Sequence, residues 1–174
     1  MISITKATQE DAGLIVDIGN ISVEEAHRAS CSAQDMREYL DKHYNDDAIQ
    51  KELSDPKNIY YLLRYNERPV GFSKIVLNAV HKNIAQGNVT QLDRIYLLKE
   101  YQDLKLGFEL LNFNIELARQ NDQSGIWLFT WVGNSKAINF YLKAGFKIIG
   151  GHHFKVTENH YNENHQMFLD LRAN

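Results

Sequence analysis

Residues 125–132 read GIWLFTWV and constrain the fold more strongly than any other part of the chain. The segment is apolar on both faces, because successive side chains of a strand point in opposite directions. A strand of this kind lies in the middle of a sheet that other elements cover on both sides. We therefore expect a layered protein in which this segment is an inner strand of the central sheet.

Two predicted helices flank this strand. Over residues 102–120, apolar side chains recur every three or four positions and form one stripe. Residues 134–144 open on Asn134, a good N-terminal cap, and are followed by Gly145, which suits the left-handed residue that ends a helix. The stripe of the first helix consists of Leu104, Phe108, Leu111, Ile115 and Ala118.

The remaining elements define the architecture. Thr8 and Asp11 form a capping-box pattern that starts a helix. The strand–helix–strand unit over residues 89–132 predicts a right-handed crossover between parallel neighbours. The whole order predicts an α/β (α+β) fold with a mixed, mostly antiparallel sheet of six to seven strands and helices on both faces. We expect the other strands at 2–5, 58–65, 70–77, 89–98, 147–156 and 166–171, and further helices at 9–20 and within 22–54.

Composition limits the classes of function. The 174 residues fit one domain, residues 1–174, without a linker or repeat. The 19 basic and 22 acidic residues give a net charge of −3, which provides no basic footprint for nucleic acid. The chain has no apolar run long enough for a membrane span, and its first residues do not resemble a signal peptide. With one cysteine, Cys31, no internal disulfide can form, so we expect a cytoplasmic protein.

Residues 93–111, DRIYLLKEYQDLKLGFELL, combine the end of a strand, a short turn and the start of a helix. The first amides of a helix have no partner within the helix, and the helix dipole is positive at that end. Such a turn is a ready anion site, best suited to phosphate. The same sequence pattern also occurs in any ordinary strand–turn–helix unit.

Two motifs resemble those of the GNAT superfamily of acyl-CoA-dependent N-acetyltransferases. The family's motif A reads Q/R-x-x-G-x-G/A, and Gln102 and Gly107 match it, whereas Lys105 stands where the first glycine is usual. Residues 134–146, NSKAINFYLKAGF, are similar to motif B, N-x-x-A-x-x-F/L-Y-x-x-x-G-F. The resemblance implies a GNAT-like fold with acetyl-CoA as cosubstrate and no metal.

The resemblance also assigns the residues of the site. Asn134 is expected to bond the pantetheine arm, and Tyr141 to lie near the thioester sulfur. The pantetheine arm is expected to run beside the main chain of Ile95, Tyr96, Leu97 and Leu98. The pyrophosphate is expected to bind amides from Gln102, Asp103, Leu104, Lys105, Leu106, Gly107 and Phe108.

The implied chemistry is direct attack of an amine on the acetyl group. A phenol with a pKa of about 10 is protonated at neutral pH, so Tyr141 is the candidate acid for the departing sulfur. Asp93 is the candidate base, because residues 92–96, LDRIY, resemble a segment of the spermidine/spermine acetyltransferase-like branch. The alternative is that Asp93 pairs with Arg94 or a lysine. Strand alternation puts Asp93 and Arg94 on opposite faces and disfavours that pair.

The sequence therefore predicts acetyl transfer from acetyl-CoA to a small-molecule primary amine, with a polyamine as the suggested acceptor. Alternatives are a protein N-terminus, an amino acid, an antibiotic, or a catalytically silent CoA-binding module, for which Lys105 is the hint. By analogy with such families, a homodimer is the expected assembly. Acids proposed for the acceptor pocket, or else for solvated faces, are Glu24, Glu25, Asp46 and Asp47. We expect no metal site at His152, His153, His160 and His165, since 152 and 153 face opposite ways.

Overall fold

The computed structural model describes residues 1–172 and contains one seven-stranded sheet. The strands are β1 (Ile2–Lys6), β2 (Ile59–Tyr65), β3 (Arg68–Val76), β4 (Val89–Leu97), β5 (Gly125–Trp131), β6 (Lys147–Lys155) and β7 (Tyr161–Asp170). The helices are α1 (Ala12–His27), α2 (Ala33–His43), α3 (Asp46–Ser54), α4 (Leu106–Gln120) and α5 (Ser135–Lys143), with short 3-10 helices η1 (Gln9–Asp11) and η2 (Lys99–Leu104).

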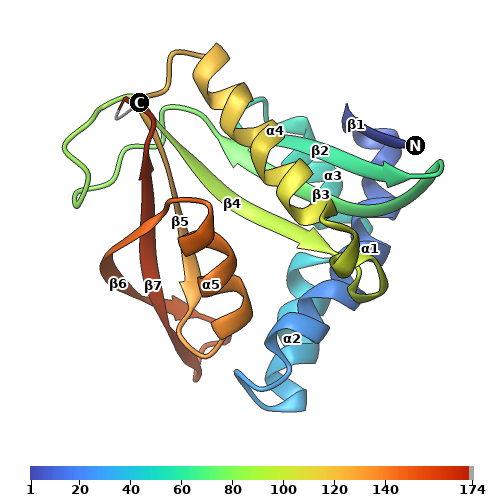
Figure 1. Cartoon of the computed structure of the whole chain (residues 1–174). Helices are drawn as coiled ribbons and strands as arrows, with labels where there is room; N and C mark the ends of the chain where they lie inside the picture. The colour runs from blue at the N-terminus through green and yellow to red at the C-terminus, as the bar shows by residue number, and fades with distance from the viewer. Residues whose placement is uncertain (173–174) are drawn as a thin grey trace.

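The sheet has the order β1-β2-β3-β4-β5-β7-β6. Its pairs are antiparallel except for β4 and β5, which are parallel, as the crossover predicts. This confirms the mixed, mostly antiparallel sheet. Residues 89–91 of β4 pair with residues 125–127 of β5, and beyond that point the two strands diverge (Figure 1). The divergence leaves one edge of β4 without a partner strand inside the sheet.

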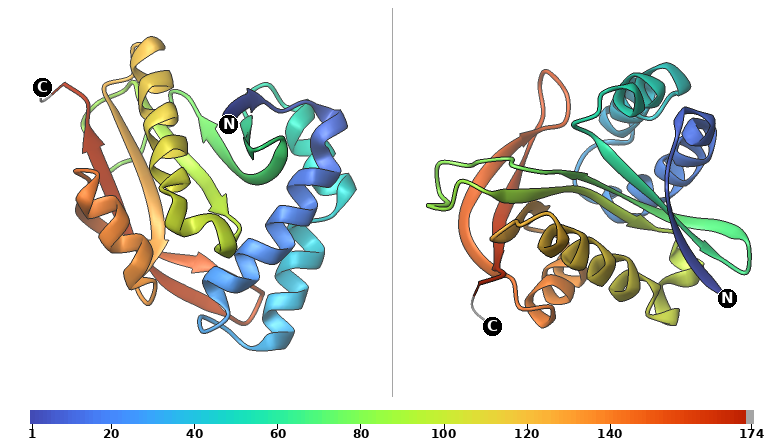
Figure 2. Two further views of the ribbon diagram at one scale, coloured as in Figure 1. Left: turned by 45° about the vertical axis from the view of Figure 1, so that its right-hand side comes forward. Right: turned by 90° about the horizontal axis from the view of Figure 1, so that it is seen from above.

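Helices cover both faces of the sheet (Figure 2). On one face, Ile15 of α1 and Ile49 of α3 pack with Leu62 of β2. On the other face, Leu111 of α4 packs with Ile126 of β5 in a cluster that also includes α5. Burial of one such side chain stabilises a fold by about 1.5–3 kcal/mol. The inner position predicted for residues 125–132 is confirmed.

Local capping sets several helix ends. The amide of Thr8 donates to Oδ2 of Asp11 at 2.9 Å, which is one half of the predicted capping box. Oδ1 of Asn134 accepts from the amide of Ala137 at 3.0 Å, so Asn134 caps α5 as expected. Gly145 has φ +95°, the left-handed conformation predicted at the end of this helix.

Three predicted boundaries were wrong. The helix predicted over 9–20 begins at Ala12 and continues to His27, and the helices predicted within 22–54 are α2 and α3. The predicted helix over 102–120 starts only at Leu106, since Lys105 has φ +60° and separates it from η2. Leu104 is consequently 48% exposed and does not join the buried stripe. The last strand begins at Tyr161, five positions before the predicted residue 166.

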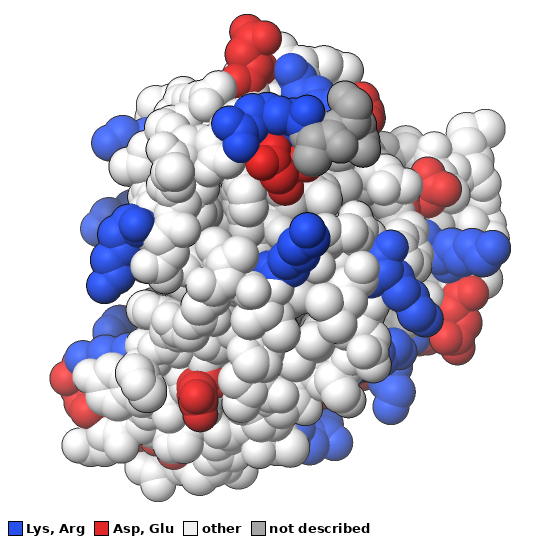
Figure 3. All heavy atoms as spheres, turned by 60° about the vertical axis from the view of Figure 1, so that its left-hand side comes forward, with Lys and Arg blue, Asp and Glu red and all other residues white. Residues whose placement is uncertain are grey.

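The surface shows acidic and basic side chains interspersed on the face drawn in Figure 3. Within residues 1–172, none of the helices combines the length and the hydropathy needed to cross a bilayer.

Candidate active site

A cavity of about 860 Å³ opens where β4 and β5 diverge. Ligand pockets in proteins commonly span about 300–1,000 Å³. Its walls come from α1 and α2, from β4 and β5, from α5, and from the hairpin of β6 and β7. The cavity therefore joins the predicted anion-binding turn to the variable helical region near the N-terminus.

The structure brings most of the predicted site residues to this space. The cavity is lined by Asp93, Ile95, Tyr96, Leu97, Gln102, Gly107, Asn134 and Tyr141. Lys105 and Phe108 line an adjoining cavity of about 210 Å³ together with Gln102 and Gly107. Asp103 and Leu104 are exposed at the turn, and Leu98 packs against the core. Leu106 is 1% exposed and its side chain belongs to the core, which leaves only its main chain for ligand binding.

The turn between η2 and α4 is built around Lys105. The carbonyl of Lys105 accepts from the amide of Phe108 at 3.0 Å and starts α4. The amides of Leu106 and Gly107 precede this first bond, as at any helix N-terminus. A Cβ on Gly107 would come no nearer than 3.6 Å to Phe140, so the protein itself does not require glycine there.

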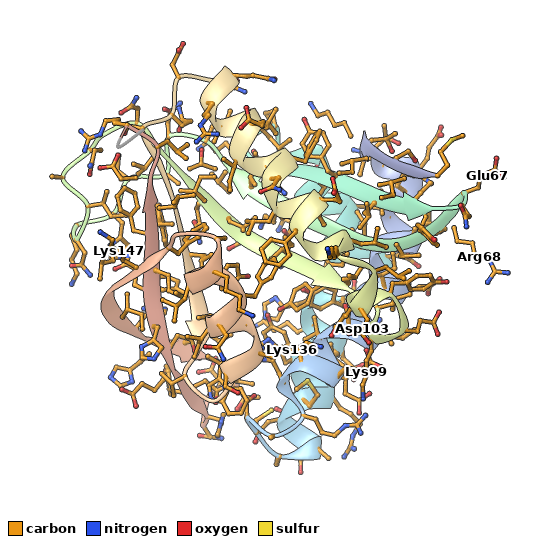
Figure 4. All side chains as sticks on the ribbon, in the orientation of Figure 1. Glu67, Arg68, Lys99, Asp103, Lys136 and Lys147 are labelled. Carbon is orange, nitrogen blue, oxygen red and sulfur yellow. The ribbon has the colours of Figure 1, made fainter. Side chains whose placement is uncertain are left out.

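Gln102 links this turn to β4 and α5. Its Nε2 donates to the carbonyl of Leu97 at 3.1 Å, and its Oε1 accepts from Nζ of Lys136 at 2.6 Å. Lys99 and Asp103 of η2 and Lys136 of α5 lie close together at this end of β4, whereas Lys147 and the turn at Glu67 and Arg68 lie elsewhere (Figure 4). Lys136 lines both cavities and places an ammonium beside the turn.

Tyr141 lies in α5 with its ring between those of Phe140 and Phe146, at centroid distances of 5.2 and 5.6 Å. The residue is 8% exposed and lines the main cavity. Burial raises the pKa of the Tyr141 phenol above its ordinary value, so the hydroxyl keeps its proton at neutral pH. A protonated phenol on the cavity wall can serve as a proton donor.

Asp93 occupies a β-bulge that strand alternation does not reveal. Lys74 of β3 lies opposite Arg94, and Ile75 lies opposite Leu92, so Asp93 is an extra residue in β4. A bulge re-aims the side chains beside it. Oδ2 of Asp93 is 2.9 Å from Nζ of Lys74 and 3.8 Å from Nε of Arg94. The prediction that Asp93 and Arg94 lie on opposite faces was therefore wrong.

Glu52, Lys74, Asp93 and Arg94 form an ion cluster that ties α3 to the sheet. The carboxylate of Glu52 lies 2.7 Å from Nζ of Lys74 and 2.9 Å from Nη2 of Arg94, and it accepts from the hydroxyl of Tyr60 at 2.7 Å. Burial acts to raise the pKa of Glu52, but Arg94 and Lys74 hold it below the ordinary value. Two acids and two bases leave the ion cluster without net charge.

His27, at the end of α1, was not predicted as a site residue. Its Nε2 lies 3.5 Å from the hydroxyl of Tyr96, and its ring centroid is 6.4 Å from that of Trp131. Burial lowers the pKa of His27, which favours the neutral imidazole at pH 7. A weakly periodic helix gives no sign that this histidine reaches β4.

Buried amides on β7 were also missed. Asn162, Asn164 and Gln166 alternate along the strand with their side chains inward. Asn164 lines the cavity, and its Oδ1 has no hydrogen-bond partner among the described residues. The period-2 pattern of amides is visible in the sequence, but the strand was predicted to begin only at residue 166.

The acids proposed for an acceptor pocket are mostly on solvent-facing helix surfaces. Glu25 lines the cavity, whereas Glu24 pairs with Arg28 at 3.2 Å, and Asp46 and Asp47 are exposed in the first turn of α3. In residues 1–172, no group of three or more histidine, cysteine or acidic side chains is arranged to hold a metal ion.

Three features together define an N-acetyltransferase-like protein. The mixed sheet parts between two parallel strands, a helix starts at one end of the gap, and a protonated tyrosine lies on the wall of the gap. Residues 18–146 match the family described as "Acetyltransferase (GNAT) family". The chain belongs to this family and is an acetyl-CoA-dependent N-acetyltransferase. The family predicted from the two motifs is thereby confirmed.

Relatives extend over most of the chain. An uncharacterized N-acetyltransferase in the pepI 3′ region of Lactobacillus delbrueckii subsp. lactis is 26% identical over 157 residues, covering 90% of this chain and 91% of that protein. An uncharacterized N-acetyltransferase of Mycobacterium bovis is 24% identical over 125 residues, covering 72% of this chain and 76% of that protein.

Solved structures share the fold. The PaiA N-acetyltransferase of Thermoplasma acidophilum, solved in complex with coenzyme A, has a TM-score of 0.77 and 20% identity, covering 98% of this chain and 99% of that one. The ribosomal-protein-S18-alanine N-acetyltransferase of Escherichia coli has a TM-score of 0.71 and 16% identity, covering 98% and 94%.

Proposed function

We propose that this enzyme transfers the acetyl group of acetyl-CoA to the primary amine of a small molecule by direct attack. The observation that carries the proposal is one continuous cavity lined by the edge of β4, the η2–α4 turn, Asn134 and Tyr141. These groups come from segments far apart in sequence, and the cavity brings together residues that could bind a thioester and residues that could act on it.

The residues at this cavity fit acetyl-CoA. Past residue 91, the edge of β4 that faces β5 has no partner strand, so its main chain is available to the amides of a pantetheine arm. The start of α4 offers amides to the pyrophosphate, and Lys136 offers an ammonium beside them. Oδ1 of Asn134 caps α5, which leaves its Nδ2 to donate to the arm.

Tyr141 and Asp93 take separate roles in the proposed reaction. The thioester supplies an activated acetyl carbon and a sulfur that leaves as coenzyme A. Tyr141 donates its phenolic proton to that sulfur as the C–S bond breaks. Asp93, whose carboxylate belongs to the ion cluster, lines the cavity that the amine enters. The role of Asp93 as the base stays a prediction.

The charge of the cavity favours an acceptor with a single amine. The carboxylates of Glu25 and Asp93 are accompanied on the cavity wall by Arg94, Lys99, Lys136 and Lys155. A polyamine, suggested by the resemblance of residues 92–96, would be attracted by an excess of negative charge. We therefore keep the polyamine as the alternative, beside a protein N-terminus, an amino acid or an antibiotic. The predicted homodimer stays a prediction, which sedimentation velocity tests.

The deciding experiment is calorimetric titration with acetyl-CoA followed by a thiol-release assay. The acceptor panel contains a monoamine, a polyamine, an amino acid, a peptide with a free N-terminus and an aminoglycoside. We expect binding and thiol release with the monoamine. Binding without release on every acceptor would identify a silent CoA-binding module, and absence of binding would overturn the proposal.

A further inference from the structure

The proposed transfer must dispose of a proton, because nitrogen loses one as the C–N bond forms. Asp93 was the predicted acceptor of that proton. Its Oδ2 lies 2.9 Å from Lys74 and 3.8 Å from Arg94, and its Oδ1 accepts from Nε2 of Gln91 at 3.2 Å. Both oxygens of Asp93 are thus already engaged by donors of the protein itself, whereas the proton acceptor needs an oxygen or nitrogen that is open to the amine.

Another pair of side chains on the cavity wall has the required groups. Tyr96 of β4 and His27 of α1 both line the cavity, as Tyr141 does. The hydroxyl of Tyr96 lies 3.5 Å from Nε2 of His27, and the two rings are edge to face with centroids 6.4 Å apart. Catalytic hydrogen bonds are often long in a protein without its substrate and shorten when it binds.

We propose that Tyr96 and His27 form a proton relay that receives the amine proton during acetyl transfer. This inference rests on the proposed function. As the amine nitrogen bonds to the acetyl carbon, its proton passes to the hydroxyl oxygen of Tyr96, and the phenolic proton of Tyr96 passes to Nε2 of His27. The C–S bond breaks, and the sulfur receives the proton of Tyr141. Exchange with water then returns a proton to Tyr141 and removes one from His27.

The environment of the pair agrees with these roles. Burial lowers the pKa of His27, so its imidazole is neutral and can accept a proton at pH 7. Burial also raises the pKa of Tyr96, so the phenol carries the proton that the relay needs. Trp131 of β5 lies beside His27 and brings no charge. The titratable groups that act on Tyr96 from neighbouring elements are Tyr39, Tyr44, Asp93, Arg94 and Tyr141. The other titratable groups that line the same cavity include Glu25, His43, Lys99, Lys136, His152 and Lys155.

The test uses the full chain with the acceptor found in the panel. We compare His27→Gln, Tyr96→Phe and the double variant, with Asp93→Asn as the rival and His165→Gln as the control. His165 lies on β7 and is not part of the cavity lining. Each variant is first shown to bind acetyl-CoA by calorimetry, which separates loss of chemistry from loss of fold.

We expect His27→Gln and Tyr96→Phe each to lower kcat about 10²-fold, the lower end of the range for a positioned acid or base. The double variant loses no more than either single variant, because the two residues act as one unit. The acidic limb of the wild-type kcat profile disappears in His27→Gln and remains in Asp93→Asn. His165→Gln keeps the wild-type rate and profile.

The relay would be overturned by an unchanged acidic limb in His27→Gln, or by losses that multiply in the double variant. Titration of the His27 imidazole by NMR in the acetyl-CoA complex gives a readout independent of turnover. We expect its midpoint below about 6.5 and equal to that of the kinetic limb. A His27 that is protonated at pH 7 would contradict the relay. A wild type that acetylates no amine would overturn the proposed function itself.

Discussion

At the scale of single residues, Tyr141 combines a packing role with a chemical one. Its ring packs against those of Phe140 and Phe146, and the residue lines the cavity. Tyr141→Phe keeps the ring and removes the proton. We expect kcat, measured by thiol release, to fall about 10²-fold, because the proton acts on the sulfur only in the transition state. The affinity for acetyl-CoA stays at the wild-type value.

Equal turnover by Tyr141→Phe would contradict the role as acid and leave Tyr141 as a packing residue of α5. Tyr141→Leu is the companion variant, since it also removes the aromatic packing. If the tyrosine only packs, the leucine variant loses thermal stability and the phenylalanine variant loses nothing.

Lys136 and Lys147 offer a matched pair of charges. Lys136 contacts Gln102 beside the turn, whereas Lys147 lies at the exposed start of β6, away from that turn (Figure 4). We expect Lys136→Ala to weaken acetyl-CoA binding about tenfold, which corresponds to about 1.4 kcal/mol, and to reduce its dependence on salt. Lys147→Ala keeps the wild-type affinity. Calorimetry at two salt concentrations measures both, and equal effects of the two variants would show that only overall charge matters.

At the scale of elements, the η2–α4 turn depends on a lysine in a backbone conformation that favours glycine. Lys105 has φ +60° and ψ +9°. This left-handed conformation costs a residue with a Cβ roughly 1–2 kcal/mol. Glycine avoids this cost, but it loses more backbone entropy on folding, which offsets part of the gain. We expect Lys105→Gly to raise the free energy of unfolding by about 0.5–1 kcal/mol, measured by urea denaturation, and to retain acetyl-CoA binding.

Lys105→Ala is the control for this turn, because it removes the charge and keeps the Cβ. It should not share the gain in stability of the glycine variant. If both variants bind acetyl-CoA less tightly by the same factor, the side chain of Lys105 contacts a phosphate. If only the glycine variant changes, the backbone conformation is responsible.

Among the elements, those fixed by local chemistry were predictable. The cap at Asn134 and the left-handed Gly145 lie within two turns of the residues that they stabilise, so a short stretch of sequence specifies α5. The bulge at Asp93 depends on how β3 pairs with β4 and leaves no mark in the sequence of β4 alone. The contact of Asp93 with a lysine and with Arg94 was the predicted alternative to its role as base, but the share of Glu52 in the ion cluster was not predicted. Glu52 reaches Lys74 and Arg94 only because α3 packs on the sheet.

At the scale of the whole molecule, the site results from the parting of β4 and β5. The sequence predicts these strands as parallel neighbours, and they are, but only over residues 89–91 and 125–127. Where they separate, α1 lies against the gap and places His27 next to Tyr96, although these two residues are 69 positions apart in the chain. No local pattern reports such a contact, which explains why the motif residues were predicted and the residues from α1 and β7 were not.

The response of the whole molecule to acid follows in part from three histidines with lowered pKa values. Burial lowers the pKa of His27, His43 and His152 in the folded protein. In the unfolded chain a histidine titrates near pH 6.5. Between this value and the lower pKa of the folded state, the unfolded chain binds more protons, so stability falls as the pH falls. Above about pH 7 these three residues are neutral in both states and contribute no pH dependence.

A second loss of stability follows at lower pH, because two carboxylates also have pKa values that are lowered in the folded protein. Arg94 and Lys74 outweigh burial and hold the pKa of Glu52 below its ordinary value, and Arg172 lowers the pKa of Asp170 to about 2. Their contributions are complete above about pH 4.3 and are lost as the pH falls through the folded-state values. We expect the urea midpoint to be flat from pH 8 to about 7, to decline below about 6.5 and to steepen below about 4.3. His43→Gln should flatten the first decline and leave the second, and a midpoint that stays constant down to pH 5 would contradict the lowered pKa values of the histidines.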